Sequence, residues 1–222
     1  MSEFRRRLMM QVASDPNALP VGCVRCEYLE GTGTQYIDTG KVVYPDQDIN
    51  IDFEFTTGSG TYVIVGWRWQ GTASDPYGFI INKLPNVNIQ IYYGTHPSNN
   101  TGIVLKDNRN NVVISPNNKK IIVNGTVASG NYDTTFTNAY NGDKGSEYHC
   151  AIFTANIAGT FIKNTVTPMK LYGYLITNSK GECVQNLVPI LDPNGKPCMY
   201  DTVSKKFHYN KGTGQFLYKI AE

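Results

Sequence analysis

The sequence predicts an all-β protein in which two antiparallel sheets pack face to face. Apolar and polar residues alternate with a period of two in several short segments, and Gly, Asn and Pro recur between them. No stretch shows a long helical period. The chain has 222 residues, and one such sandwich commonly takes about 200–250. We therefore expect a single domain of this class.

The clearest alternation lies at residues 49–55. Apolar residues there alternate with Asn50, Asp52 and Glu54, which predicts a strand with one buried and one exposed face. The run Tyr62–Gly66 is apolar throughout and is typical of a central strand. Further strands are expected at residues 77–81, 87–93, 112–114, 120–123, 126–128, 148–153, 169–176 and 182–188.

Two local signals concern a hairpin turn and a short helix. Asn124-Gly125 stands between alternating runs and predicts a hairpin, because both residues of such a turn must accept a positive φ. Residues 155–158 are the interior helical candidate, one or two turns long. Neither internal repeats nor low-complexity blocks interrupt the chain.

Composition and net charge limit the classes of partner that the sequence predicts. Hydrophobic residues make up 41% and charged residues 17%, as in an ordinary globular domain, and the net charge is +2. This charge is too small to predict a nucleic-acid or membrane partner. No stretch approaches the roughly 20 apolar residues that span a bilayer, and Glu3 disrupts the basic region of a signal peptide. We expect assembly in a cytoplasm without secretory export.

The five cysteines show no disulfide framework. Cys23 and Cys26 form a C-x-x-C motif, whose alternative roles are a metal site or a redox pair, but no second close pair accompanies it. Reduced and mostly buried thiols are the expectation. The three histidines lack metal-ligand spacing, and the acidic loop Asp46-Gln-Asp48 has too few carboxylates to predict a calcium site. The sequence thus predicts neither a metal nor a cofactor.

Residues 1–22 differ from the domain at residues 23–222. At helical spacing Phe4, Leu8 and Val12 share a face, and the arginines at positions 5–7 largely point away from it. The segment Ser14–Pro20 then breaks the pattern. A helix this short is marginal alone and is ordered by a partner surface. We interpret residues 1–22 as a docking arm and linker.

Both ends of the domain carry a family resemblance. The segments Tyr28–Gly40, Leu191–Thr202 and Lys206–Phe216 resemble the concanavalin A-like, laminin-G-like jelly rolls of bacteriophage virion structural proteins. The resemblance implies a jelly-roll sandwich whose closing elements pair the two ends of the domain. Starts like Glu3–Leu8 accompany these domains in similar phage and prophage proteins.

The resemblance implies a non-enzymatic virion structural protein displayed on the particle surface. A capsid decoration or head-fibre protein is preferred over a tail fibre, because one domain and one arm are small for a complete tail adhesin. Whether it forms a homo-oligomer stays open. The arm would contact capsid or fibre proteins through apolar pockets and carboxylates. The docking residues on this interpretation are Phe4, Arg5, Arg6, Arg7, Leu8 and Met9.

The alternative function is a carbohydrate-binding adhesin module of a tail fibre or cell-surface protein. Exposed aromatic rings suit the apolar faces of sugars, and the candidates are Trp69, Tyr77 and Tyr92. The competing interpretation places Trp67 in the core with Trp69 capping a sheet edge. Of Tyr92 and Tyr93, adjacent on a strand, one is expected to be buried and one exposed.

A third class, the glycosidase, rests on Asn50-Ile-Asp-Phe-Glu54. This segment resembles the Glu-x-Asp-x-Glu strand of concanavalin A-like β-glucanases, whose alternate carboxylates flank a glycosidic bond. Asn50 stands where that family has its nucleophilic glutamate, and an amide does not attack a sugar as a carboxylate does. We therefore predict no catalytic residue, with Asp52 and Glu54 on the solvent face of a half-buried strand.

Deletion of residues 1–12 tests the docking arm. We expect the truncated protein to fold and stay soluble but to be missing from purified particles, because the apolar docking face is gone. Quantitative immunoblotting of particles measures incorporation, with circular dichroism as the folding control. Incorporation at the normal level would contradict the arm's role.

Overall fold

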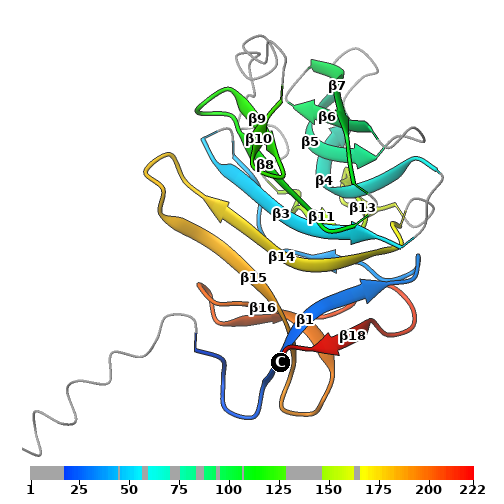
Figure 1. The fold of residues 1–222 in the computed structure, drawn as a ribbon, viewed down its shortest axis with the longest axis vertical. Coiled ribbons are helices and arrows are strands. Elements are labelled where there is room, and N and C mark those ends of the chain that lie inside the picture. Colours follow the sequence, from blue (N-terminus) through cyan, green and yellow to red (C-terminus); the bar gives the residue numbers. More distant parts are fainter. Residues whose placement is uncertain are drawn as a thin grey trace, which may run out of the picture.

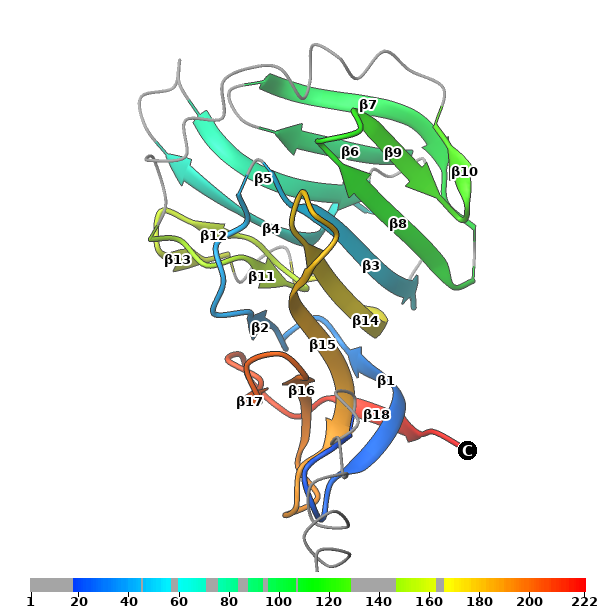
Figure 2. The ribbon, with the colours of Figure 1, turned by 90° about the vertical axis from the view of Figure 1, so that its left-hand side faces the viewer.

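The computed structural model describes residues 18–44, 46–56, 60–70, 76–83, 88–93, 96–106, 108–128, 147–162 and 166–222. Every regular element within these ranges is a β-strand, and the strands form two sheets (Figures 1 and 2). The described residues include no helix long and apolar enough to cross a membrane.

The larger sheet joins the two ends of the domain. Its strand order is β10-β9-β8-β3-β14-β1-β15-β16-β17, and β18 pairs with β1. These strands are β1 (Val24–Gly31), β3 (Asp48–Phe55), β8 (Asn110–Ser115), β9 (Lys120–Val123), β10 (Thr126–Val127), β14 (Met169–Thr177), β15 (Cys183–Leu191), β16 (Pro197–Asp201), β17 (Lys206–His208) and β18 (Leu217–Ile220).

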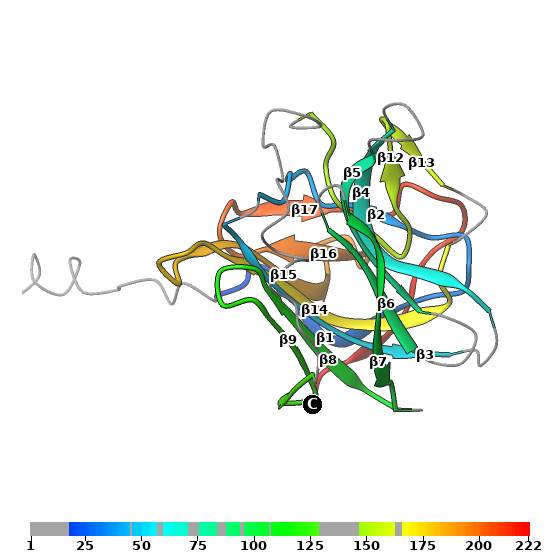
Figure 3. The same cartoon turned by 90° about the horizontal axis from the view of Figure 1, so that it is seen from above.

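The smaller sheet has the order β13-β12-β4-β5-β6-β7, and β11 pairs with both β4 and β2. Its strands are β2 (Ile37–Asp38), β4 (Tyr62–Gln70), β5 (Pro76–Lys83), β6 (Asn88–Tyr93), β7 (His96–Val104), β11 (Ala151–Ile152), β12 (Asn156–Ile157) and β13 (Thr160–Phe161). Seen from above, β3, β14 and β15 belong to one layer and β4, β5 and β6 to the other (Figure 3). The predicted two-sheet sandwich is confirmed.

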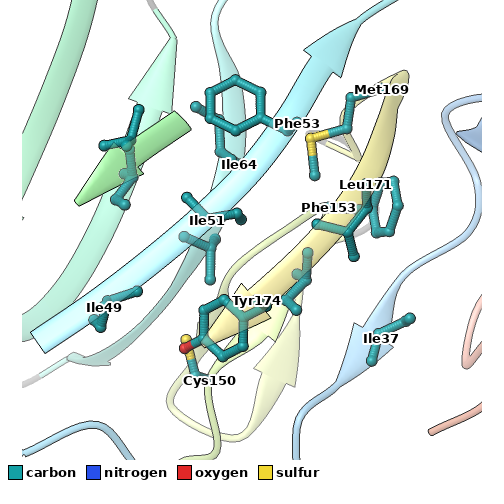
Figure 4. Packing of buried hydrophobic residues seen from close by; sticks show 14 of the residues in the cluster. Ile37, Ile49, Ile51, Phe53, Ile64, Cys150, Phe153, Met169, Leu171 and Tyr174 are labelled. Atoms are coloured by element: carbon teal, nitrogen blue, oxygen red, sulfur yellow. The ribbon is translucent and has the colours of Figure 1, made fainter. Parts of the chain in front are cut away.

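One apolar core fills the space between the sheets. Ile49, Ile51 and Phe53 point inward from β3 and are at most 1% exposed, so the predicted alternation of this strand is correct. Ile64 of β4 and Phe153 meet them from the other side (Figure 4). Full burial of one such side chain stabilises the fold by roughly 1.5–3 kcal/mol, so the period-two pattern determines which face is inside.

The local predictions have different outcomes. Asn124 has φ 51° and Gly125 φ 79°, which confirms the hairpin between β9 and β10. The helical turn at residues 155–158 is wrong: β12 lies there, and a turn at Ala158 (φ 50°) and Gly159 (φ 82°) leads into β13. β12 pairs in parallel with β4, a long-range contact that overrides the local helix preference.

Residues just before the predicted boundary at residue 23 contact the domain. Leu19 packs against a satellite cluster formed by Ile190, Cys198 and Tyr200 on β15 and β16. The Cys23 amide donates to the Pro20 carbonyl at 3.1 Å, which turns the chain into β1. Residues 1–17, and with them most of the proposed arm, lie outside the described residues.

Two of the three family-like segments, Tyr28–Gly40 and Lys206–Phe216, meet, as the resemblance implied. We call their contact, between residues 34–38 and 208–215, the terminal seam. The Lys211 amide donates to the Tyr36 carbonyl at 2.9 Å, and the Thr213 amide donates to the Thr34 carbonyl at 3.2 Å. Asn210 Oδ1 accepts from the Tyr36 amide at 3.1 Å. Backbone groups that the terminal turns would leave unpaired are thereby satisfied.

Gly212 permits the closest approach in the terminal seam. A Cβ at this position would lie 1.9 Å from the Thr34 carbonyl oxygen and 3.2 Å from the Gln35 Cα. Both obstacles are main-chain atoms, so neither can rotate away as a flexible side chain would. The position therefore requires glycine for close backbone contact.

We expect Gly212→Ala to lower the free energy of unfolding by roughly 1–3 kcal/mol, because the added methyl group forces the two backbones apart. Urea denaturation followed by tryptophan fluorescence measures the change. Gly173→Ala is the matched control, since a Cβ there meets its nearest atom at 3.8 Å. Equal stability of Gly212→Ala and wild type would show that the seam is loose.

Candidate functional site

The strongest candidate site lies on the outer face of the larger sheet, over β3, β8, β14 and β15. β3, β14 and β15 lie side by side in this sheet (Figure 1). Asn50, Asp52 and Glu54 point outward from β3 while the residues between them are buried, as the alternation predicts. The side chains of Asp52 and Glu54 remain 24% and 22% exposed.

An irregularity in β14 hollows this face. Leu171 pairs with Phe53 and Gly173 with Asp52, so Tyr172 is an extra residue that bulges from the ladder. Gly173, next to the bulge, presents no side chain. The result is a recess of about 170 Å³, which we call the sheet recess. It is lined by Asn50, Asp52, Asn111, Gly173, Tyr174, Leu175 and Asn186.

Amide groups dominate the polar lining of the sheet recess. Asn111 Nδ2 donates to Asn50 Oδ1 at 2.7 Å, and Asn186 Nδ2 donates to Thr202 Oγ1 at 2.9 Å. These bonds fix the amide planes. Among the described residues, Asn50 Nδ2 and Asn186 Oδ1 have no protein partner, so these two lining residues keep one donor and one acceptor unused.

A charged and aromatic ridge borders the recess. The Arg109 guanidinium donates two hydrogen bonds to Asp52, at 2.8 and 2.6 Å, and its carbon lies 4.1 Å from the centre of the Tyr172 ring. The Tyr28 ring meets Tyr172 edge-on at 5.5 Å. The bidentate pair and the ring contacts hold each other in place, which makes the ridge a preorganised surface.

Glu54 is held as a carboxylate. Lys170 Nζ donates to its Oε1 at 2.7 Å and the Tyr172 hydroxyl donates to its Oε2 at 2.8 Å. The hydrogen bond from Lys170 is the main cause that lowers the pKa of Glu54, while partial burial opposes it. Burial is the main cause that raises the pKa of Tyr172, and its hydrogen bond to Glu54 raises this pKa further. A carboxyl with a lowered pKa is poorly suited to be a general acid.

The predicted aromatic platform lies on the other sheet. Trp67 is 1% exposed, which confirms its place in the core, and Trp69 is half-buried and packs against the same core. Tyr77 pairs with Trp69, and Tyr92 pairs with Ile80, but their side chains lie outside what the structure describes. The predicted docking residues, Phe4 to Met9, also lie outside the described residues.

No group of three or more His, Cys, Asp or Glu side chains in the described ranges is arranged to hold a metal ion. All five cysteines are reduced, and Cys26, Cys150 and Cys198 are buried. Burial raises the pKa of the Cys26 thiol to about 11 and that of Cys150 to about 12. Such thiols are inert at neutral pH.

Sequence reasoning missed most of the sheet recess. Of its lining only Asn50 and Asp52 were singled out, whereas Asn111 and Asn186 come from distant segments, as do Arg109 and Tyr172 of the bordering ridge. Gly173 carried a usable signal, because a glycine inside an alternating run marks a bulge or a close approach.

No protein-family model matches the chain, and no curated protein matches it. Among solved structures, a putative carbohydrate binding protein from Bacteroides ovatus ATCC 8483 superposes with a TM-score of 0.56 at 10% identity, over 90% of this chain and 61% of that chain. This chain is a jelly-roll sandwich. At this identity the likeness shows the fold alone.

Two further structures are similar to the jelly roll at lower scores. The CBM40 domain of the Ruminococcus gnavus IT-sialidase has a TM-score of 0.48 at 12% identity, over 69% of this chain and 90% of that chain. The SAP-like pentraxin of Limulus polyphemus has a TM-score of 0.49 at 11% identity, over 92% of this chain and 98% of that chain.

The lowered pKa of Glu54 links this site to stability. The folded state binds fewer protons here than the unfolded state, so the carboxylate stabilises the fold above its ordinary pKa of 4.5 and this gain disappears as the pH falls through the folded value. We expect Glu54→Gln to remove roughly 0.2–1 kcal/mol of the acid-induced destabilisation. Lys170→Met should do the same. Urea denaturation from pH 6 to pH 3 measures it, and wild-type pH dependence in both variants would contradict the ion pair.

Proposed function

We propose that this jelly roll is a non-catalytic carbohydrate-binding module that holds a glycan against the outer face of the larger sheet. The observation that carries the proposal is the sheet recess, in which the missing side chain of Gly173 leaves space between the amides of Asn50, Asn111 and Asn186. The similar structure from Bacteroides ovatus, named a putative carbohydrate binding protein, supports the same class.

The lining suits sugar hydroxyls. Each hydroxyl both donates and accepts, and a side-chain amide offers both partners in one plane. The Leu175 side chain, which also lines the recess, offers apolar surface for the C–H face of a sugar ring. The small volume, about 170 Å³, fits one sugar unit with its neighbours running along the strands.

Binding without hydrolysis follows from the state of the carboxylates. Asp52 is engaged by Arg109 and Glu54 by Lys170, each with a hydrogen bond shorter than 3 Å. A retaining glycosidase needs a nucleophile and a proton donor about 5–5.5 Å apart. Asn50 replaces the nucleophile, and the ionised Glu54 has no proton to give at neutral pH.

We further propose that residues 1–22 attach the module to a larger assembly, a phage capsid or head fibre, through Phe4, Arg5, Arg6, Arg7, Leu8 and Met9. Support comes from the sequence of this segment, and Leu19 near its end packs against β15 and β16. A module so attached would present its sheet recess at the virion surface.

A glycan array with the full-length protein tests the binding function. We expect Gly173→Leu to abolish binding, because the new side chain fills the sheet recess, and Asn186→Ala to weaken binding about threefold to tenfold through a lost hydrogen bond. Thr177→Ala, farther along β14 and outside the recess, is the matched control. Thermal denaturation checks that each variant folds.

Three results would contradict the proposal. Wild-type binding by Gly173→Leu would remove the sheet recess from consideration. Loss of binding in Trp69→Ala with no effect at Gly173 would move the site to the smaller sheet. Release of reducing sugar from a bound β-glucan, abolished in Glu54→Gln, would show a glycosidase.

A further inference from the structure

A second recess lies on the terminal seam, apart from the sheet recess. It also measures about 170 Å³ and is lined by Gly33, Thr34, Tyr36, Val166, Lys211, Gly212 and Thr213. None of these residues lines the sheet recess. We call it the seam recess. Its two walls come from opposite ends of the domain, so it exists only in the folded protein.

The walls of the seam recess are rigid. Thr34 Oγ1 donates to the Thr213 carbonyl at 3.0 Å, while the Thr213 amide donates to the Thr34 carbonyl at 3.2 Å. Gly33 has φ 107°, a backbone conformation that side chains disfavour, and Gly212 touches the opposite wall. A preformed cavity of this kind binds a ligand without the cost of ordering its own walls.

The seam recess combines an apolar floor with a cation. Tyr36 is 6% exposed, its ring stacks on Phe161 at 5.0 Å, and Val166 lies beside it. The Tyr36 hydroxyl has no hydrogen bond to the residues that the structure describes. Lys211 at the rim is exposed, and it forms no ion pair with any residue that the structure describes. The recess thus has an apolar surface, a hydroxyl and an uncompensated positive charge.

We propose that the seam recess binds a single sugar that carries a carboxylate, of the uronic acid class. The Lys211 ammonium pairs with the carboxylate, the apolar floor takes the C–H face of the ring, and the hydroxyls of Thr34 and Tyr36 meet the ring hydroxyls. The volume is below the roughly 300 Å³ of sites for larger ligands, which limits the occupant to about one sugar ring. This inference rests on the proposed glycan binding and deepens it by adding an anionic subsite.

Titration of the ¹⁵N-labelled full-length protein tests this subsite directly. Glucuronate and galacturonate are the probes, with glucose, galactose and acetate as matched comparisons at constant ionic strength. We expect saturable shifts of the Gly33, Lys211 and Gly212 amides with the two uronates alone. Lys211→Ala should weaken binding about tenfold to a hundredfold, as expected for a lost charge-assisted hydrogen bond, and Lys211→Arg should retain it.

Lys206→Ala is the control for a general loss of positive charge, since this exposed lysine of β17 is not part of the recess. Equal responses to acetate would show a simple carboxylate site, and equal responses to the neutral sugars would remove the role of the charge. Either of these results overturns the proposal. The proposal also fails if no probe gives a saturable response, or if Lys211→Ala binds the uronates as wild type does. Gly173→Leu separates the two sites: uronate binding should survive it, whereas glycan binding at the sheet recess should not.

Discussion

The fold depends on the main-chain contact between its first and last motifs. At the terminal seam, Gly212 lies so close to the Thr34 carbonyl that any side chain would collide with it. The contact brings residues about 180 positions apart into hydrogen-bond distance, as from Gln35 Nε2 to the Gln215 carbonyl at 3.2 Å. Closure of so long a loop costs conformational entropy, which many cooperative contacts must offset.

Closure at the seam positions both recesses. β18 pairs with one edge of β1, and β14 pairs along the other at Leu29, so the C-terminal strand helps to hold the strand that adjoins β14. β14 in turn carries Gly173 and the Tyr172 bulge that form the sheet recess. The seam itself supplies the walls of the other recess. Both recesses thus lie on one framework, and side chains held by regular strands are positioned more precisely than those on loops.

Ion pairs engage the carboxylates of Asp52 and Glu54 on the outer face of β3. The strand that resembles a β-glucanase keeps two of three acidic positions, but Arg109 and Lys170 neutralise them. A catalytic pair would need carboxyl groups whose pKa values diverge, one of them raised. Here the pKa of Glu54 is lowered, so the same side chains act as fixed supports for Tyr172.

The sequence pattern predicted those features of the fold that depend on residues close together in the chain. The alternation at β3 and the Asn124-Gly125 turn followed from residue periodicity and turn geometry, and the core position of Trp67 agrees with the competing interpretation that a large aromatic ring anchors the core. The short strand β12 was assigned to a helix because its pairing with β4 is a long-range contact. β7 (His96–Val104) was missed, since its polar run becomes a strand only beside β6.

The candidate site was the hardest part to predict for the same reason. Asn50, Asn111 and Asn186 are common polar residues, and only the strand order of the folded sheet brings them together. The prominent tryptophans drew attention to the smaller sheet, although Trp69 packs against the core. Gly173 was the one local clue, as a break in an otherwise regular strand.

Native-state hydrogen exchange at the seam tests most directly whether the whole framework depends on this closure. The amides of Lys211 and Thr213 donate across the seam, to Tyr36 and Thr34. We expect both to exchange with the free energy of global unfolding, together with the amides of β1 and β14. Exchange of the seam amides at a much lower free energy, while β1 and β14 stay protected, would show that the ends fray independently and that the seam does not hold the sandwich together.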